Sequence, residues 1–466
     1  MTTYKNLDSW IVTETQIALR KLNDYGSPAP PSELKEVDPF VIRDDTHRDE
    51  LFKTGIMAIK RNEVAFLVLS AGQGTRLGSS DPKGMMEIPF PNPNPRNPVD
   101  TLITHFAKKT QALQTLASKY EDENGEITGI QPAITFILMT APEINIKIKK
   151  FVGTEIVEKK ILKSGQIIIV DQDIVPCLTF DGNVIPRSED TIQVSPNGNG
   201  GILQALEKIN DDMKARRIKY VHVISVDNLM AKVCDPLAIG IMISEGAEVL
   251  NKVIERVKPD EPCGLMVQAK VGDNLWKSKV VEYSEIDPAL AQARNADESL
   301  KFKYANICNH FFTFDFLEDL YMNEVRLPYH KAIKKVGVYD ENTCKIVAPT
   351  KPNAVKLERF IFDLFDHAKK VVTMTVQRNL EFSPIKNPND ANVDCMNTAM
   401  KSLYTMYDSW LDNYELQQSV VEYNKVALHQ FYLDSTKTYA GEDLDGYFTV
   451  KLPSILTADD GIPNFE

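Results

Sequence analysis

Apolar and polar residues follow one another along this chain in blocks that predict strands separated by helices. Short apolar runs, typical of strands buried in a parallel sheet, cover residues 64–69, 133–140, 166–170, 220–226, 310–314 and 371–376. Between the first two runs, residues 101–120 carry Leu102, Phe106, Leu113 and Leu116 at near-helical spacing. A second apolar helix face occupies residues 202–209. Strands that alternate with helices predict a right-handed, mostly parallel α/β sheet, a mixed sheet flanked by helices.

The same pattern divides the chain into three predicted parts. Residues 1–62 form a helical segment, in which an amphipathic helix carrying Leu19 and Leu22 ends at the Gly/Pro-rich stretch 26–31. Residues 63–383 form the central α/β domain. Residues 384–466 are predicted to be a small C-terminal domain, with a helix around Met396 to Asn413 and β-like pieces around Tyr447 to Leu452.

Composition narrows the class of protein. The chain has 466 residues, of which 43% are hydrophobic and 25% charged, so it can bury a core. Its net charge of −12 argues against nucleic acid or an anionic membrane surface as a partner. No apolar run approaches the roughly 18 residues of a membrane-spanning helix, and the N-terminus lacks the apolar core of a signal peptide. The six scattered cysteines are expected to be free thiols. Together these features predict a cytoplasmic protein.

A loop rich in small residues follows the first apolar run. Residues 70–84 read SAGQGTRLGSSDPKG. Glycines let backbone N–H groups approach a ligand closely, and Arg76 and Lys83 add two cations, so the loop predicts a phosphate site. It is not a Walker A loop, because Lys83 is followed by Gly84. It is not the dinucleotide fingerprint either, because the third glycine comes one residue late, at Gly78.

This loop, with Gly72-x-Gly74-Thr75-Arg76 and then Pro82-Lys83, resembles the signature of sugar-1-phosphate nucleotidyltransferases. Further blocks resemble those of the eukaryotic UDP-N-acetylhexosamine pyrophosphorylases and occur in that family's order. They are PNGNGG at 196–201, VDN at 226–228, VEYSEI at 281–286, NICNHFF at 306–312, KPN at 351–353 and FSPIKN at 382–387. The resemblance implies a Rossmann-like, GT-A-like nucleotidyltransferase fold. It also implies an enzyme that converts UTP and N-acetylglucosamine 1-phosphate into UDP-N-acetylglucosamine and pyrophosphate, with Mg²⁺ or alternatively Mn²⁺.

The chemistry of that reaction fits the charged residues. The attacking phosphate oxygen is already anionic, so no general base is needed, and catalysis must neutralise and align the phosphates. The resemblance assigns this role to Arg76, Lys83 and Lys386. Asp227, at the end of a predicted strand, would bind Mg²⁺ through one carboxylate together with substrate phosphates. The alternatives are a surface salt bridge for Arg76, a turn or N-cap role for Asp227, and a solvated linker lysine at 386.

Substrate recognition also carries over from the family. The nucleotide-binding residues implied are Ala71, Gly72, Gly74, Thr75, Gln172 and Gly198. The sugar-binding residues implied are Asn199, Gly264, Glu282, Asn306, Phe360 and Phe362, with Lys356 as a further candidate for phosphate contact. Core packing is an equal alternative for the two phenylalanines, and His310 is expected to be a core residue.

The chain departs from the family pattern near these residues. Asp173 and Ala71 stand where the family has or often has glycine, which puts the local loop shape at Asp173 in question. Residues 271–279 look inserted between Gly264 and Glu282, as a hairpin tip.

Other functions stay open on the residues alone. The nearest is a UDP-glucose or broad-specificity UDP-sugar pyrophosphorylase, and a non-catalytic sugar-nucleotide-binding protein could use the same fold. A glycosyltransferase is disfavoured because Asp227 has no second carboxylate with which to form a D-x-D motif. The expected partners are small molecules, with no nucleic acid and no membrane, and the expected state is a monomer or weak homo-oligomer.

Overall fold

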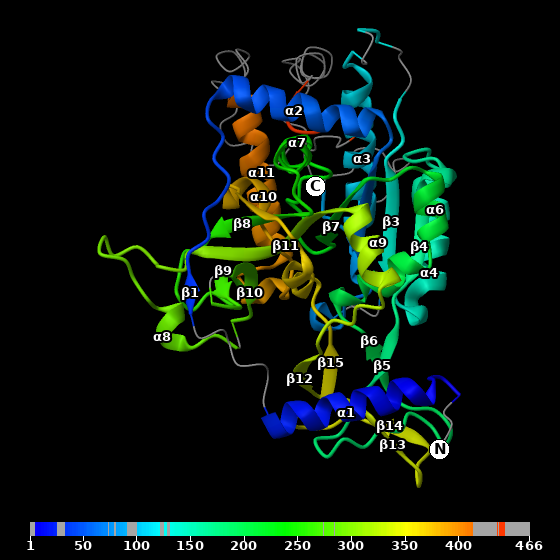
Figure 1. Ribbon diagram of the computed structural model, residues 1–466. Helices are drawn as coiled ribbons and strands as arrows, with labels where there is room; N and C mark the ends of the chain where they lie inside the picture. Colours follow the sequence, from blue (N-terminus) through cyan, green and yellow to red (C-terminus); the bar gives the residue numbers. More distant parts are fainter. Residues whose placement is uncertain are drawn as a thin grey trace, which may run out of the picture.

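A computed structural model shows one mixed sheet with helices on both faces and a smaller group of strands at one end (Figure 1). It describes residues 5–25, 33–72, 74–78, 81–90, 100–121, 125–127, 131–273, 275–283, 285–412, 436 and 438–442. The predicted α/β architecture, a sheet flanked by helices, is confirmed.

The parallel part of the sheet carries the glycine-rich loop. Its strands, in spatial order, are β4 (Ile167–Asp171), β3 (Thr135–Thr140), β2 (Val64–Leu69) and β7 (Tyr220–Ser225). All neighbours in this order run parallel. The carboxyl ends of these strands therefore meet at one edge, which is where ligands of such sheets bind. The four strands coincide closely with the apolar runs in the sequence.

Antiparallel strands extend the sheet beyond β7. They are β11 (Tyr304–Thr313), β8 (Val249–Glu255), β9 (Leu265–Lys270), β10 (Trp276–Val281) and the short β1 (Leu34–Lys35). A last strand, β16 (Val371–Thr375), pairs parallel with β8. β11 begins well before the apolar run at 310–314. A register shift between Asn306 and His310 interrupts the alternation of its side chains, so the sequence pattern does not reveal the first part of the strand.

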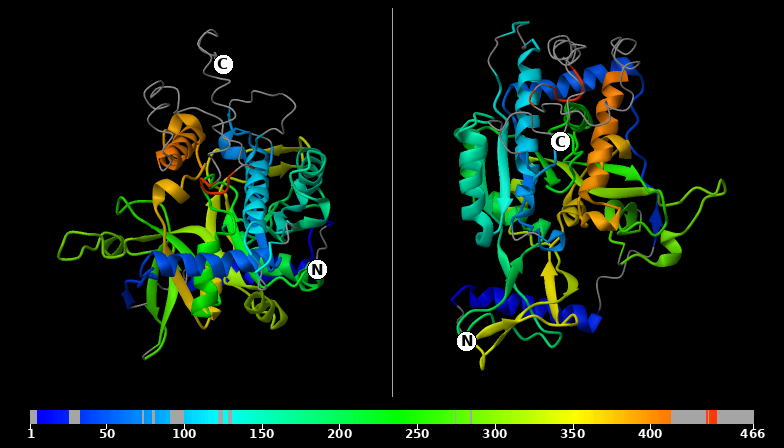
Figure 2. Two further views of the ribbon diagram at one scale, coloured as in Figure 1. Left: turned by 90° about the horizontal axis from the view of Figure 1, so that it is seen from above. Right: turned by 180° about the vertical axis from the view of Figure 1, so that it is seen from behind.

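The two faces of the sheet bury separate cores. Along β2, Val64, Phe66 and Val68 face one core while Ala65 and Leu67 face the other, as the period of two requires. The first core is covered by α2 (Asp45–Lys60), α3 (Leu102–Ser118), α4 (Pro142–Val152), α7 (Pro236–Glu245) and α11 (Met396–Asp412). The second is covered by α5 (Ile202–Glu207), α6 (Asn210–Ala215) and α9 (Phe314–Met322). Figures 1 and 2 show the sheet between these two groups of helices.

Helices α2 and α7 touch backbone to backbone. A Cβ at Gly55 would lie 1.8 Å from the carbonyl oxygen of Pro236, and one at Gly240 would lie 1.8 Å from that of Leu51. Only glycine permits this approach from both sides. The contact fixes the N-terminus of α7, and with it the N-cap residue Asp235.

The smaller strands gather beside α1 (Ser9–Tyr25), at the end of the molecule away from α2 (Figures 1 and 2). They form the pairs β5 (Ile174–Pro176) with β6 (Val194–Pro196), β12 (His330–Lys334) with β15 (Ala354–Glu358), and β13 (Val338–Asp340) with β14 (Lys345–Val347). Leu19 and Leu22 of α1 are buried against this group, as their spacing predicts. The N-terminal segment thus serves as a packing layer at both ends of the molecule.

The predicted C-terminal helix is confirmed as α11. Its apolar residues join the same core as α2 and α3, and so does Tyr439. The β-like pieces predicted around Tyr447 to Leu452 lie outside the described residues, and the division of the chain into three domains stays a prediction. Across the part of the chain that the structure describes, no helix has the length and apolar character needed to cross a bilayer.

Candidate active site

The glycine-rich loop lies directly beside two adjoining cavities of about 570 Å³ and 240 Å³. Ala71 and Gly72 line both, and a Cβ at Gly72 would meet no atom within 4 Å, so the backbone there faces open space. The N–H of Lys83 donates to the carbonyl of Gly72 at 3.1 Å, which closes the loop. The Gly-Thr-Arg stretch forms a 3₁₀ turn, η1 (Gly74–Leu77). The side chains of Thr75 and Arg76 lie outside the described part, so the role predicted for Arg76 stays a prediction.

The smaller cavity brings together residues from four separate blocks of sequence. Besides the loop, Gln172, Gly198, Asn199 and Lys356 line it. Gln172 follows β4 and is 3% exposed, and its Oε1 has no hydrogen-bond partner among the described residues. A buried, unpaired amide oxygen beside a cavity is suited to accept a hydrogen bond from a ligand donor. Gln172 and Gly198, which were predicted to bind the nucleotide, thus lie around one cavity with Asn199 and Lys356, which were predicted to contact the sugar or a phosphate.

Gly198 is glycine for a packing reason that the sequence did not reveal. Its φ is +80°, and a Cβ there would lie 2.4 Å from the carbonyl oxygen of Arg359. The residue therefore holds the strand-to-helix turn against the segment after β15, as well as lining the cavity. Asp173, the departure beside Gln172, is accommodated without a left-handed backbone, and its carboxylate accepts from Lys208 Nζ at 2.7 Å.

Lys83 and Asp227 form an ion pair at the carboxyl edge of the sheet. Lys83 Nζ donates to Asp227 Oδ2 at 3.0 Å, and each side chain is 16% exposed. Burial opposes ionisation of Asp227, but Lys83, the Ser225 hydroxyl and Lys386 together hold the pKa of that carboxyl below its usual value. The carboxylate is therefore ionised near neutral pH and reachable from solvent.

Lys386 reaches this pair through a backbone connection. The N–H of Ile385 donates to the carbonyl of Asp227 at 2.9 Å, so the segment before Lys386 runs alongside the end of β7. Lys386 itself is exposed, and its charge acts on Asp227 and also on Glu282. Three of the four residues predicted to handle phosphate or metal therefore lie together, although none of the three lines the two cavities.

The residues predicted to bind sugar assemble around β9, β10 and β11. The inserted stretch 271–279 contains the turn between β9 and β10, as predicted, but its residues 276–279 already belong to β10. The hairpin returns Glu282 to within 3.1 Å of a Cβ placed on Gly264. The N–H of Asn306 donates to the carbonyl of Gly264 at 2.8 Å. Burial and the neighbouring Glu285 raise the pKa of Glu282. These three residues thus form one polar group.

The two phenylalanines lie at the edge of the second core. They flank the start of the 3₁₀ helix η6 (Ile361–His367), and their ring centroids are 5.0 Å apart. Phe362 is buried in the core and Phe360 is half-buried, so Phe362 is a packing residue while the ring of Phe360 is partly accessible. Asn199 is tied to the same segment, because its Oδ1 accepts from the N–H of Ile361 at 2.9 Å.

Two residues near the sugar group were not predicted. His330 stacks on Phe360 with ring centroids 4.3 Å apart, and its two ring nitrogens bond Glu285 at 3.0 Å and Asp363 at 2.9 Å. Burial works against the charged ring, but the two carboxylates raise the pKa of His330 to about 9. No local pattern marks it, since its partners are 45 and 33 residues away.

The other is Cys308, in the irregular part of β11. Its φ is +51°, and its Sγ lies 3.9 Å from Asn199 Nδ2. Burial, with the charge of Asp227, raises the pKa of the thiol to about 12, so it stays protonated. His310, two residues on, is confirmed as a core residue: it is fully buried, Nδ1 bonds Asn251 at 2.8 Å, and burial lowers its pKa to about 3.

Asp227 is the candidate ligand for a divalent cation. Among the described residues, no group of three or more His, Cys, Asp or Glu side chains could hold a metal ion. A reachable, ionised Asp227 at the same edge of the sheet as the glycine-rich loop does fit Mg²⁺, which is commonly bound through one or two carboxylates, water and substrate phosphates.

Comparison with known proteins gives concordant results. The family described as UTP--glucose-1-phosphate uridylyltransferase matches residues 32–440. The chain is 37% identical over 397 residues to a UDP-N-acetylhexosamine pyrophosphorylase-like protein 1 of Xenopus tropicalis, covering 84% of this chain and 73% of that protein. It is 32% identical over 432 residues to the UDP-N-acetylglucosamine pyrophosphorylase of Saccharomyces cerevisiae, covering 90% and 82%.

A solved structure agrees with these relatives. The uridine diphosphate N-acetylglucosamine pyrophosphorylase of Trypanosoma brucei, in complex with an inhibitor, superposes with a TM-score of 0.77 at 25% identity. The match covers 96% of this chain and 88% of that one.

Proposed function

The chain belongs to the UTP--glucose-1-phosphate uridylyltransferase family, and we propose that it joins UTP to N-acetylglucosamine 1-phosphate, releasing pyrophosphate. The observation that carries this proposal is the meeting of the glycine-rich loop, Gln172, Gly198 and Asn199 around one cavity, with the Lys83–Asp227 ion pair at the same edge of the sheet. The named activities of the yeast and trypanosome proteins support the choice of substrates.

In this proposal the smaller cavity takes the nucleotide. Gln172 Oε1, buried and unpaired, accepts a hydrogen bond from the uracil N–H, which would select uracil over cytosine. The backbone of Ala71 and Gly72 faces the triphosphate, and Arg76 in η1 adds the forked cation suited to phosphate oxygens. Lys356 lines both cavities and is placed to contact a phosphate.

The reaction is an in-line displacement at the α-phosphate. A phosphate oxygen of the sugar phosphate forms the new P–O bond, the bond between the α- and β-phosphates breaks, and pyrophosphate leaves with that electron pair. Lys83 and Lys386 neutralise anions that repel each other most strongly as they approach, which is stabilisation of the transition state. Asp227 would hold Mg²⁺, which supplies further charge neutralisation at the phosphates when bound. The half-open Lys83–Asp227 pair lets both side chains exchange partners for substrate groups.

The sugar would lie against the second group of residues. Glu282 and Asn306 can bond its hydroxyls, while Phe360 and Phe362 offer an apolar place for the acetyl methyl group. This apolar place favours N-acetylglucosamine 1-phosphate over glucose 1-phosphate.

A pyrophosphate-release assay tests the proposal. Purified protein with UTP, Mg²⁺ and N-acetylglucosamine 1-phosphate should release pyrophosphate, and replacing the sugar by glucose 1-phosphate should raise KM and lower turnover. Equal turnover of both sugars would favour a broad UDP-sugar pyrophosphorylase, and no release with any sugar 1-phosphate would favour a non-catalytic binding protein. The cytoplasmic location and the monomeric or weakly oligomeric state stay predictions.

A further inference from the structure

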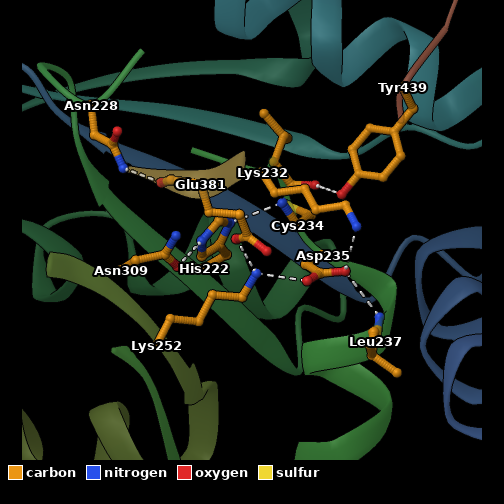
Figure 3. A network of polar contacts seen from close by, with 11 residues as sticks. His222, Asn228, Lys232, Cys234, Asp235, Leu237, Lys252, Asn309, Glu381 and Tyr439 are labelled. Carbon is orange, nitrogen blue, oxygen red and sulfur yellow. Dashed lines mark hydrogen bonds and ion pairs between the residues drawn. The ribbon is translucent and has the colours of Figure 1, made fainter. Parts of the chain in front are cut away.

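A buried ion-pair network lies behind the reaction centre and takes no part in the chemistry proposed above. Lys252 of β8 places its Nζ 2.6 Å from Asp235 Oδ2 and 2.6 Å from Glu381 Oε2 (Figure 3). The side chains of Lys252, Asp235 and Glu381 are 0%, 1% and 12% exposed. Glu381 is the last residue of α10 (Arg378–Glu381), so the network joins a strand, a helix N-cap and a helix end that are distant in sequence.

Lys252 and Asp235 are held in their charged forms. Burial favours the neutral forms, but Asp235 and Glu381 raise the pKa of Lys252, and Lys232 and Lys252 lower that of Asp235. Lys232 Nζ, 3.7 Å from Asp235 Oδ1, supplies a second cation. A buried lysine held between two carboxylates has little freedom to move, so it fixes the distance between them.

Asp235 is itself held in place by neighbouring residues. The N–H of Cys234 donates to His222 Nδ1 at 2.9 Å, so His222 carries its proton on Nε2, which donates to Asn309 Oδ1 at 2.9 Å. On the other side, the Tyr439 hydroxyl donates to the carbonyl of Val233 at 2.7 Å (Figure 3). One end of the network is thus anchored in the core.

Glu381 is held at a second point, by the residue next to Asp227. Asn228 Nδ2 donates to the carbonyl of Glu381 at 2.8 Å, and Asn228 Oδ1 accepts from the N–H of Ser383 at 3.0 Å. Asn228 is 3% exposed, so both bonds are made in the dry interior. Its amide thus brackets residues 381–383, immediately before the segment whose Ile385 bonds Asp227.

We propose that Lys252, Asp235, Glu381 and Asn228 form a clamp that positions Lys386 over Asp227. The clamp fixes Glu381 by its carboxylate and by its carbonyl, and Glu381, Ser383 and Ile385 are each hydrogen-bonded to Asn228 or Asp227, just after β7. Lys386 follows at once, and its own N–H donates to the carbonyl of Asp394 at 2.6 Å. The place of Lys386 is therefore set by residues that never touch a substrate. This inference rests on the proposed function.

Such a clamp acts on kcat more than on nucleotide binding. Misplacement of a reacting group by about 1 Å can cost on the order of 10²-fold in rate. The nucleotide cavity is lined by Gln172 and Gly198, which the clamp does not touch, so UTP binding should be spared. A group that acts through Lys386 should also have no further effect once Lys386 has lost its ammonium.

The test compares Glu381→Gln with a matched control. Gln keeps the volume and the carbonyl bond to Asn228 but removes the charge held by Lys252. The control is Glu63→Gln. Glu63 is likewise buried and paired with cations, Arg61 and Lys219, but it lies just before β2, at the end of that strand away from the glycine-rich loop. We expect Glu381→Gln to lower kcat by about 10- to 100-fold with KM for UTP changed only a few-fold, and Glu63→Gln to leave kcat unchanged.

A double-mutant cycle with Lys386→Ala separates positioning from general damage. The double variant Glu381→Gln/Lys386→Ala should be no slower than Lys386→Ala alone, whereas a merely structural effect would multiply with it. Asn228→Ala, which leaves the buried charges intact, should give the same non-additive loss if Glu381→Gln does not fold.

The outcomes against the clamp are distinct from failure of the proposed function. Unchanged kcat in Glu381→Gln and Asn228→Ala, or losses that multiply with Lys386→Ala, would overturn the clamp while the unmodified protein stays active. An unmodified protein that releases no pyrophosphate would overturn the proposed function instead.

Discussion

Lys83 and Lys252 both bind a carboxylate from the stretch between β7 and α7, yet their surroundings differ. Lys83 has one acidic partner, Asp227, at 3.0 Å, and both side chains are 16% exposed. Lys252 has two, Asp235 and Glu381, both at 2.6 Å, and it is wholly buried. A half-open pair can exchange its partner for a phosphate or a cation, whereas a closed network can only hold its own members in place.

The difference in burial gives two aspartates of one loop different roles: Asp227 can exchange its partner, whereas Asp235 holds other residues in place. Asp227 and Asp235 are eight residues apart in sequence, and a count of charges would treat them alike. Burial decides between them, because an ion pair without water can be broken only at the cost of leaving a charge unpaired. Loss of a charge from the Lys83–Asp227 pair should therefore lower activity with little loss of stability, whereas loss of a charge from the Lys252 network should lower stability as well as activity.

The largest expected effect is on stability, in Lys252→Met. Met fills a similar volume but leaves Asp235 and Glu381 buried without their cation, so the free energy of unfolding should fall by about 3–5 kcal/mol. Denaturant unfolding followed by circular dichroism would measure it. Lys270→Met is the control, because Lys270 binds Glu33 at 2.8 Å on the surface and its loss should cost at most about 1 kcal/mol. Equal losses in the two variants would show that the buried network does not carry unusual weight.

Asp227→Asn should mainly lower activity and leave stability nearly unchanged. Asn keeps the volume but loses the charge proposed to hold Mg²⁺, so kcat should fall by about 10²- to 10³-fold, equivalent to roughly 2.7–4 kcal/mol of transition-state stabilisation. Stability should change little, because water can reach both members of the half-open pair. Steady-state kinetics over a range of Mg²⁺ concentrations, with thermal unfolding alongside, would check this. If the variant unfolds as readily as Lys252→Met, Asp227 has a structural role and not the proposed one.

The surroundings of the Lys83–Asp227 pair were predicted better from the sequence than the buried network of Lys252. Gly72 and Asp227 each follow a buried strand, and parallel strands bring their carboxyl ends together, so the strand pattern alone places both residues at one edge of the sheet. The glycine-rich loop and its cations formed a recognisable pattern because these residues are close neighbours in the sequence.

The closed region has no such local pattern. Lys252 and Glu381 are 129 residues apart, and only the fold brings them together. One signal was present in the sequence: Lys252 interrupts the apolar run VLNKVIE of β8, and a lysine within a buried strand needs an acidic partner. The identity of that partner depends on where α10 packs, which no spacing rule gives. The conformation of Cys308 likewise depends on strand pairing rather than on residue type.

His330 is a second cation held between two carboxylates, and its charge can be removed by raising the pH. It bonds Glu285 and Asp363 as Lys252 bonds Asp235 and Glu381, with Glu282 as a further acidic neighbour. Lys252 stays charged throughout the accessible range, because its pKa is raised above 10.5. The pKa of His330 is raised from 6.5 to about 9, so its charge, and the stabilisation it brings, can be titrated away without a mutation.

The smallest expected effect follows from that titration. Because the folded-state pKa is higher than the unfolded one, His330 stabilises fully below about pH 6.5, and this stabilisation is lost as pH rises through about 9. A rise in pKa from 6.5 to about 9 corresponds to at most about 3.5 kcal/mol, at about 1.4 kcal/mol for each pKa unit. Solvent screens the partly exposed ring, so we expect a loss of about 2–3 kcal/mol. Unfolding of the natural protein and of His330→Gln at pH 6, 7.5, 9 and 10 would show the two curves converging above pH 9. His222 and His310, with pKa values lowered to about 3, stay neutral across this range and contribute equally to both proteins.

Since His330 also stacks on Phe360, KM for the sugar phosphate should rise over the same interval while KM for UTP stays constant. Curves that remain parallel up to pH 10 would show that the ring carries no charge between its two carboxylates, and that Lys252 alone among the two cations holds its partners by charge.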